Sequence, residues 1–184
     1  ATIAKNVVTI VGAGTSTITA VQASSASYLS GTITATLTVI PGTTVLSNFS
    51  VPAKTFGDAS FGIVTPTTNS DGTFTYTSSN TAVATVAGNV VTIVGGGTAT
   101  ITATQATTSI YAAGSITATL TVNKIVTVLS SFSAITKTFG NAAFALVAPT
   151  TNSTGSFSYT SSNTAVATVS GSTVTIVGAG TATI

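Results

Sequence analysis

Apolar and polar residues alternate with a period of two along several segments of the chain. Residues 115–122 carry Ile, Ala, Leu and Val at every second position with Ser or Thr between them, and residues 32–39 and 98–104 follow the same alternation. Such alternation in β-branched residues is typical of strands with one buried and one solvated face. No segment has the 3.6-residue spacing of an amphipathic helix. The pattern predicts an all-β protein.

The whole pattern is itself repeated: position 7 corresponds to position 90 and to position 173, a period of 83. Residues 90–98 match residues 7–15 and residues 173–181, and residues 74–86 return as residues 157–169. A period of this length is a domain-sized unit copied in tandem. The predicted organisation is one complete unit over residues 40–122, preceded by the later strands of a unit in residues 1–39 and followed by the earlier strands of a unit in residues 123–184.

The complete unit contains seven predicted strands, separated by turns rich in Gly, Asn, Asp and Ser. Seven short strands in a unit of this length favour an immunoglobulin-like β-sandwich, so the fold class is tandem immunoglobulin-like repeats. The predicted strands are residues 44–49, 60–64, 73–78, 82–86, 90–94, 98–104 and 115–122.

Comparison of the copies separates a predicted core from a predicted surface. Positions that differ between copies, such as Val90 and Asp71, are expected to be exposed. Apolar residues that meet an identical residue wherever a copy exists are expected to be buried. These are Phe49, Phe56, Phe61, Phe74, Tyr76, Val83, Val91, Ile93, Ile101, Leu120 and Val122.

The chain lacks most of the side chains that enzymes use for catalysis. The chain has no His, Cys, Met, Trp or Arg, and its charges are four Lys and two Asp. It therefore offers no imidazole base, no thiol nucleophile and no carboxylate pair that recurs between copies. We expect no enzyme activity, no catalytic residue, no cofactor and no metal site.

Charge and hydropathy also bear on partners and location. The net charge of +2 is small and scattered, whereas nucleic-acid binding needs clustered Lys and Arg. No apolar run approaches the roughly 18–20 residues of a membrane-spanning helix. More than a third of the residues are Ser or Thr, so hydroxyl groups, not charges, bind water at the surface. We expect no nucleic acid, no membrane insertion and an extracellular setting.

Three segments of the second half of each unit form a recognisable motif: residues 76–86, 88–92 and 97–103, with the sequences YTSSNTAVATV, GNVVT and GTATITA. In these residues the chain resembles bacterial immunoglobulin-like (group 2) domains. The resemblance implies a β-sandwich stalk module of cell-surface adhesins, large extracellular repeat proteins or phage structural proteins, without catalytic residues. The chain departs from the family at the strand of Phe74 and Tyr76, which has no Trp.

Outward threonines on two strands expected to be neighbours form the first candidate site. The functional interpretations are O-glycosylation, lateral packing between fibres, or ordered hydration of the ice-binding kind. We favour the simpler interpretation, that Thr is the β-favouring polar residue of a solvated face, and sheet twist disfavours a match to a lattice. The residues are Thr100, Thr102, Thr104, Thr117, Thr119 and Thr121.

Recurring lysines and asparagines form a second candidate, a Lys–Asn isopeptide cross-link. The residues are Lys54 and Asn80 and their copies Lys137 and Asn163. This chemistry needs a buried carboxylic acid beside the amine. Asp58 becomes Asn141 in the next copy. Because the acid is not kept, the cross-link is disfavoured.

The two partial units allow two interpretations. In one, the residues belong to a longer repeat chain; in the other, the tail of one molecule completes a sandwich with the head of the next. Equivalents of residues 84–101 occur in both partial units, which favours the longer chain. In both cases an isolated half-sandwich has an apolar face without a partner sheet.

The sequence therefore predicts a structural stalk, rod or filament at a bacterial or phage surface. Self-association into fibres is expected, through the same chain continued or through head-to-tail or lateral contacts between copies. The alternative is an adhesin whose loops, at one end of the sandwich, bind a host receptor or a glycan.

Overall fold

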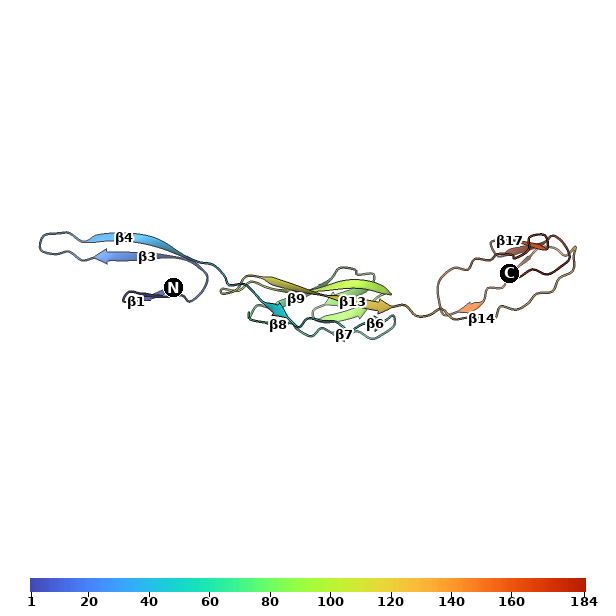
Figure 1. The fold of residues 1–184 in the computed structure, drawn as a ribbon, viewed down its shortest axis with the longest axis horizontal. Coiled ribbons are helices and arrows are strands. Elements are labelled where there is room, and N and C mark those ends of the chain that lie inside the picture. The colour runs from blue at the N-terminus through green and yellow to red at the C-terminus, as the bar shows by residue number, and fades with distance from the viewer. The chain divides into compact units, whose positions relative to one another are not determined.

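The computed structural model describes residues 1–184 and consists of strands, turns and loops without a helix (Figure 1). The predicted all-β fold is confirmed. The chain divides into two compact units, Ala1–Ile125 and Val126–Ile184, which are described separately. The finer division at residues 39 and 122 stays a prediction.

The centre of the first unit is a β-sandwich. One sheet has the order β6-β13-β12-β9, and the opposite layer has the order β10-β11-β7 with a separate pair β5-β8. This order matches an immunoglobulin fold, in which the C, F and G strands face the A, B, E and D strands. The strands are β5 Leu46–Ser47, β6 Lys54–Thr55, β7 Phe61–Gly62, β8 Thr67–Thr68, β9 Phe74–Ser78, β10 Ala84–Ala87, β11 Val90–Ile93, β12 Gly97–Gln105 and β13 Gly114–Asn123.

The hairpin of β12 and β13 is the largest paired element of the sandwich. Its antiparallel register runs without a break from Gly97 opposite Val122 to Gln105 opposite Gly114. Ile101 and Leu120 are both 0% exposed, whereas the threonines between the apolar positions lie on the outer face. The predicted alternation, apolar inside and hydroxyl outside, is confirmed.

Residues from both layers meet in one core. The four-stranded sheet contributes Ala99, Ile101, Leu120 and Val122, and the partly buried rings of Phe49, Phe61 and Tyr76 pack at its margin. The opposite layer and its loops contribute Ile63, Val83, Ala84 and Val91. Each large side chain fully buried in this way contributes about 1.5–3 kcal/mol to folding.

Phe56 was expected in the core, and this prediction is wrong. Its side chain is 47% exposed. Its backbone NH, directly after β6, donates to the carbonyl of Asn123, the last residue of β13. The prediction was based on the identity of Phe56 with Phe139 in the next copy. Copies that have diverged little have identical residues at exposed positions as well as at buried ones. The short strands β6 and β8 were also missed, since two residues are too few to show alternation.

Gln105 is the one large polar side chain of the core and was not predicted. It is 1% exposed. Its amide nitrogen donates to the carbonyls of Ser70 and Gly72, at 3.0 and 2.8 Å, and its amide oxygen accepts the hydroxyl of Thr68 at 2.5 Å. The side chain thus joins the end of β12 to the turn before β9 with every polar atom paired.

Residues before the sandwich repeat part of its structure. The strands β1 Thr2–Ala4 and β2 Val7–Thr9 pair as β10 pairs with β11. The strands β3 Gly14–Gln22 and β4 Gly31–Val39 form a hairpin, blue in Figure 1, with Gly14 opposite Val39. This register equals that of β12 and β13 moved back by one repeat period.

The second unit repeats the other layer. Its sheets are β15-β18-β17 and β14-β16, and the pair Ala167 and Ile176 repeats the pair Ala84 and Ile93 one period later. The turn between the paired strands recurs as well, with Gly88 and Gly171 both at φ 58°. Only a residue that tolerates positive φ fits this turn without strain. The strands are β14 Leu129–Ser130, β15 Phe144–Ala145, β16 Thr150–Thr151, β17 Ala167–Ser170 and β18 Thr173–Ile176.

We predict that Gln105→Ala lowers the free energy of unfolding of the first unit by about 2–3 kcal/mol, because two backbone carbonyls lose their donor inside the core. The matched control is Gln22→Ala, at the same repeat position in β3, where the side chain is exposed. Urea unfolding followed by circular dichroism measures both. Equal losses from the two variants would contradict the assigned role of Gln105.

Candidate functional site

The six predicted threonines lie together on the outer face of the four-stranded sheet. Thr100 is opposite Thr119, and Thr102 is opposite Thr117. Thr104 lies opposite Ser115, and Thr121 lies opposite Thr98. We call this surface the threonine face: Thr75, Thr77, Thr98, Thr100, Thr102, Thr104, Ser115, Thr117, Thr119 and Thr121.

The third strand of the threonine face is β9, which the sequence had not placed beside β12. Thr77 pairs with Thr102, and Thr75 pairs with Thr104 and donates its hydroxyl to the Thr104 carbonyl at 3.5 Å. The hairpin of β3 and β4 has a similar ladder, with Thr17 opposite Thr36. The face is therefore a property of the repeat.

Chemically, the threonine face is an uncharged, hydrated array of hydroxyl groups. In a β-sheet, neighbouring strands lie about 4.8 Å apart and residues on one face of a strand recur about every 6.8 Å, which sets the spacing of this array. Most of these side chains are exposed, with Thr100 and Thr102 half-buried. Alternation about a buried core accounts for all of them, which agrees with the simplest interpretation of the pattern. Glycosylation and lateral packing stay predictions.

The isopeptide candidates Lys54 and Asn80 are kept apart by the sheet. Lys54 lies in β6 and Asn80 follows β9, and these strands form opposite edges of the four-stranded sheet. The ammonium of Lys54 lies over the ring of Phe61, 5.0 Å from its centroid. In the second unit the ammonium of Lys137 lies in the same way over Phe144, at 5.1 Å. Each lysine thus has a cation–π contact in place of an amide partner.

Asn80 belongs to a turn that holds the recurring SSN motif. Its side-chain oxygen accepts the NH of Ala82 at 3.1 Å, while the hydroxyl of Ser79 accepts the NH of Thr100 at 2.9 Å. Asn163 repeats the first bond with Ala165 at 3.1 Å. Side-chain oxygens that bond nearby backbone NH groups build Asx turns. The recognisable motif is therefore structural.

Other recurring polar residues also serve turns and strand ends. Asn69 accepts the NH of Val45 at 2.9 Å and donates to the carbonyl of Thr43 at 3.2 Å. Asn152 makes the two equivalent bonds, with Val128 and Val126, at the same lengths. A single amide thus ties two chain segments that are far apart in sequence.

The replacement of Asp58 by Asn141 between copies has the same explanation. Asp58 accepts the NH of Thr55 at 2.8 Å, and Asn141 accepts the NH of Thr138 at 3.0 Å. An oxygen acceptor is all that the turn needs, so the negative charge is dispensable. This is why no acid is kept at this position.

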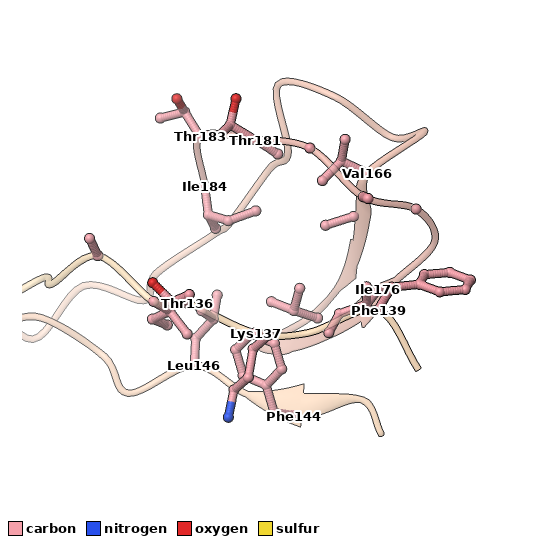
Figure 2. A pocket seen from close by; sticks show the side chains of 18 of the residues that line it. Thr136, Lys137, Phe139, Phe144, Leu146, Val166, Ile176, Thr181, Thr183 and Ile184 are labelled. Carbon is pink, nitrogen blue, oxygen red and sulfur yellow. The ribbon is translucent and has the colours of Figure 1, made fainter. Parts of the chain in front are cut away.

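The second unit contains a groove of about 610 Å³, lined by apolar and polar residues, which we call the unit-2 groove (Figure 2). Phe144 and Leu146 lie on one side of it and Ile184 lies across from them. Leu146 and Val174 are the most buried members, whereas Phe132 at the rim is 42% exposed. The groove lies beside the core cluster of Leu146, Ala167 and Val174.

The structure contains no cluster of three or more His, Cys, Asp or Glu side chains. It also has no helix of the length and hydrophobicity needed to cross a membrane.

Comparison with known proteins gives a match for part of the central sandwich. Residues 67–107, from β8 through β12, match the family model of the intimin immunoglobulin-like domain. This segment is similar to a bacterial immunoglobulin-like domain. The predicted resemblance is thereby confirmed, and it includes the SSN turn and the strand of Ile101. No curated protein and no solved structure matches the chain.

We predict that the intact mass of the chain equals the sum of its residues, without the loss of ammonia that an isopeptide bond would cause. The reason is the separation of β6 from β9 and the contact of the Lys54 ammonium with the ring of Phe61. Mass spectrometry of the denatured chain measures this. A mass lower by one ammonia, abolished by Lys54→Arg, would contradict the geometry.

Proposed function

We propose that this chain is a non-enzymatic structural module of a bacterial extracellular or cell-surface protein, and that it adds length and stiffness to a rod or stalk. The match to the intimin immunoglobulin-like domain supports an adhesin-type structural module. The observation that carries the rod is the recurrence of strand registers and turns from one repeat to the next. Length in such proteins grows with copy number.

Stiffness is supported by the link that leads into the central sandwich. The NH of Gly42 donates to the carbonyl of Ile110 at 2.7 Å, and the NH of Ala112 donates to the carbonyl of Gly42 at 2.8 Å. The hydroxyl of Thr44 bonds the carbonyl of Ala112. A link whose Gly42 is held by two backbone hydrogen bonds differs from a flexible Gly/Ser spacer.

A non-enzymatic role is supported by the use of the polar residues. Asn69, Asn80, Asp58 and Gln105 all have their side-chain oxygens bonded to turns or strand ends. Catalysis needs titratable groups aimed at one reacting centre. The extracellular setting is supported by the match to the intimin immunoglobulin-like domain and fits a chain without oxidisable Cys or Met.

The alternative function is an adhesin that binds a receptor or glycan through its loops. The intimin match is the observation in its favour. Under this alternative the loops at one end of the sandwich would bind a soluble glycan or a host-cell surface. Under the structural proposal, neither binds the chain, and the module only separates other domains from the cell.

The experiment that tests the rod is small-angle X-ray scattering at low concentration. The full chain is expected to scatter as a semi-rigid rod. Insertion of Gly-Ser-Gly-Ser between Pro41 and Gly42 is expected to make it flexible, because the inserted residues separate the preceding repeat from Gly42, which is bonded to residues 110 and 112. The control is the same insertion in the exposed β3–β4 loop, after Ser25. Flexible scattering from the unmodified chain would contradict a stiff link.

A further inference from the structure

One edge of the four-stranded sheet in the central sandwich is open to a further strand. The sheet has the order β6-β13-β12-β9, so β6 and β9 are its edge strands (Figure 1). We propose that β9 pairs antiparallel with β9 of a second copy of this chain and joins the two four-stranded sheets into one continuous sheet. The proposal rests on the proposed structural role and deepens it by naming the surface through which two modules associate side by side.

The register of β9 shows which of its backbone groups face away from the sheet. The NH of Ser79 donates to the carbonyl of Thr100 at 3.0 Å, and the NH of Ala106 donates to the carbonyl of Thr73 at 2.9 Å. Bonded positions alternate along an antiparallel strand, so every second residue from Thr73 to Ser79 bonds to β12. The residues between them direct their NH and carbonyl groups outwards, and they are Phe74, Tyr76 and Ser78.

These outward groups have no backbone partner within the chain. The only strand that pairs with β9 is β12, and no backbone hydrogen bond from a loop reaches Phe74, Tyr76 or Ser78 on the outward side. The strand belongs to the central sandwich, whose two layers are both formed around one core. The edge therefore presents a series of unpaired donors and acceptors, which is a template for another strand.

The edge of β9 also lacks the features by which edge strands avoid such pairing. Protected edges are very short, charged or interrupted by Pro. The other edge strand, β6, is two residues long and contains Lys54. In contrast, β9 is five residues long and has the sequence FTYTS, without a charge or a Pro. Of the two edges of this sheet, only that of β9 is suited to strand addition.

Two antiparallel copies of β9 are complementary to each other. The register that bonds all the outward groups has Tyr76 opposite Tyr76 of the second copy and Phe74 opposite Ser78. Thr75 then lies opposite Thr77 on the outer face, where both side chains are exposed. The rings of Phe74 and Tyr76 are half-buried and stacked, with centroids 6.0 Å apart. Pairing thus places hydroxyl groups beside hydroxyl groups and aromatic rings beside aromatic rings.

A second copy fits this edge better than an unrelated extended peptide. Strand addition gains specificity from pockets or charges that recognise alternate side chains, whereas the outer side of β9 offers only the hydroxyl groups of Thr75 and Thr77. Two copies with a net charge of +2 each repel one another little. Because Lys54 protects the other edge, the pairing closes at two sheets. The threonine faces of both copies then form one surface.

The first test is amide hydrogen exchange of the full chain, followed by NMR over a dilution series. The NH groups of Thr75 and Thr77, bonded to β12, are expected to exchange slowly at every concentration. Those of Tyr76 and Ser78 are expected to exchange at least about tenfold more slowly in concentrated than in dilute samples, because only the pair bonds them. Outward amides that exchange at one rate at all concentrations would overturn the proposal.

Charged variants test the seam with the same readout. In Thr75→Lys/Thr77→Lys each lysine faces a lysine of the other copy, so protection of the outward amides is expected to need at least about tenfold higher concentration. A mixture with Thr75→Glu/Thr77→Glu is expected to restore it, because each lysine then faces a glutamate. The matched control is Thr117→Lys/Thr119→Lys, with the same charges on the same face of β13 inside the sheet. A control that weakens pairing as much as the edge variant contradicts the assignment.

A disulfide tests the register, since the chain has no Cys of its own. Chains with Thr75→Cys mixed with chains with Thr77→Cys are expected to cross-link under mild oxidation, because the two positions face each other with Cβ atoms about 4.5–5.5 Å apart. Either variant alone is expected to link much less, as its cysteines lie on a diagonal. The control mixture is Thr117→Cys with Thr119→Cys. Cross-linking of the control but not of β9 would replace edge pairing by stacking of the threonine faces.

Failure of this proposal and failure of the proposed rod are distinguishable. Scattering at low concentration reports the stiffness of single molecules whether or not β9 pairs. A stiff chain whose outward amides never become protected would overturn lateral pairing and leave the rod intact. A flexible chain whose β9 becomes protected and cross-links would support the pairing and contradict the rod.

Discussion

The structure depends on one contact, the burial of the apolar face of the β12–β13 hairpin against the opposite layer of the sandwich. Ile101 and Leu120 lie at its centre with no exposed surface. The hairpin also gives β9 its antiparallel partner and β6 its parallel partner, so the four-stranded sheet exists only around it. Residues 126–184 include no equivalent of β13, and their strands form the sheets β15-β18-β17 and β14-β16.

The recurring polar residues stabilise the turns of the fold. In a chain with few charges, the recurring amides and hydroxyls bond backbone groups at turns, as Asn69 and Asn80 do in the first unit and Asn152 and Asn163 do in the second. Their recurrence reflects repeated turn geometry. The replacement of Asp58 by Asn141 shows that geometry, not charge, is retained between copies.

Much of the fold could be predicted from the sequence because strand alternation and turn residues are local. Alternation placed Ile101 inside and Thr100 on the outer side, and Gly88 marks the turn of a two-residue hairpin. The threonine face followed from the same alternation, although the contribution of β9 did not. Identity between copies was a weaker signal, since it placed the exposed Phe56 in the core. The burial of Gln105 gave no local signal, because its partners, in the turn before β9, lie far from it in the sequence.

By itself, the sequence determined the hairpins, their registers and the face that each strand buries, because these follow from neighbouring residues and turns. Tertiary structure decided which segments become strands at all. Residues 74–78 and 157–161 differ at a single position, yet only the first is a strand, because only the first has β12 beside it. Gln105 and Gln22 occupy one repeat position, yet one is buried and the other exposed. A strand needs a hydrogen-bonded neighbour and a core needs a second layer, and both come from distant parts of the chain.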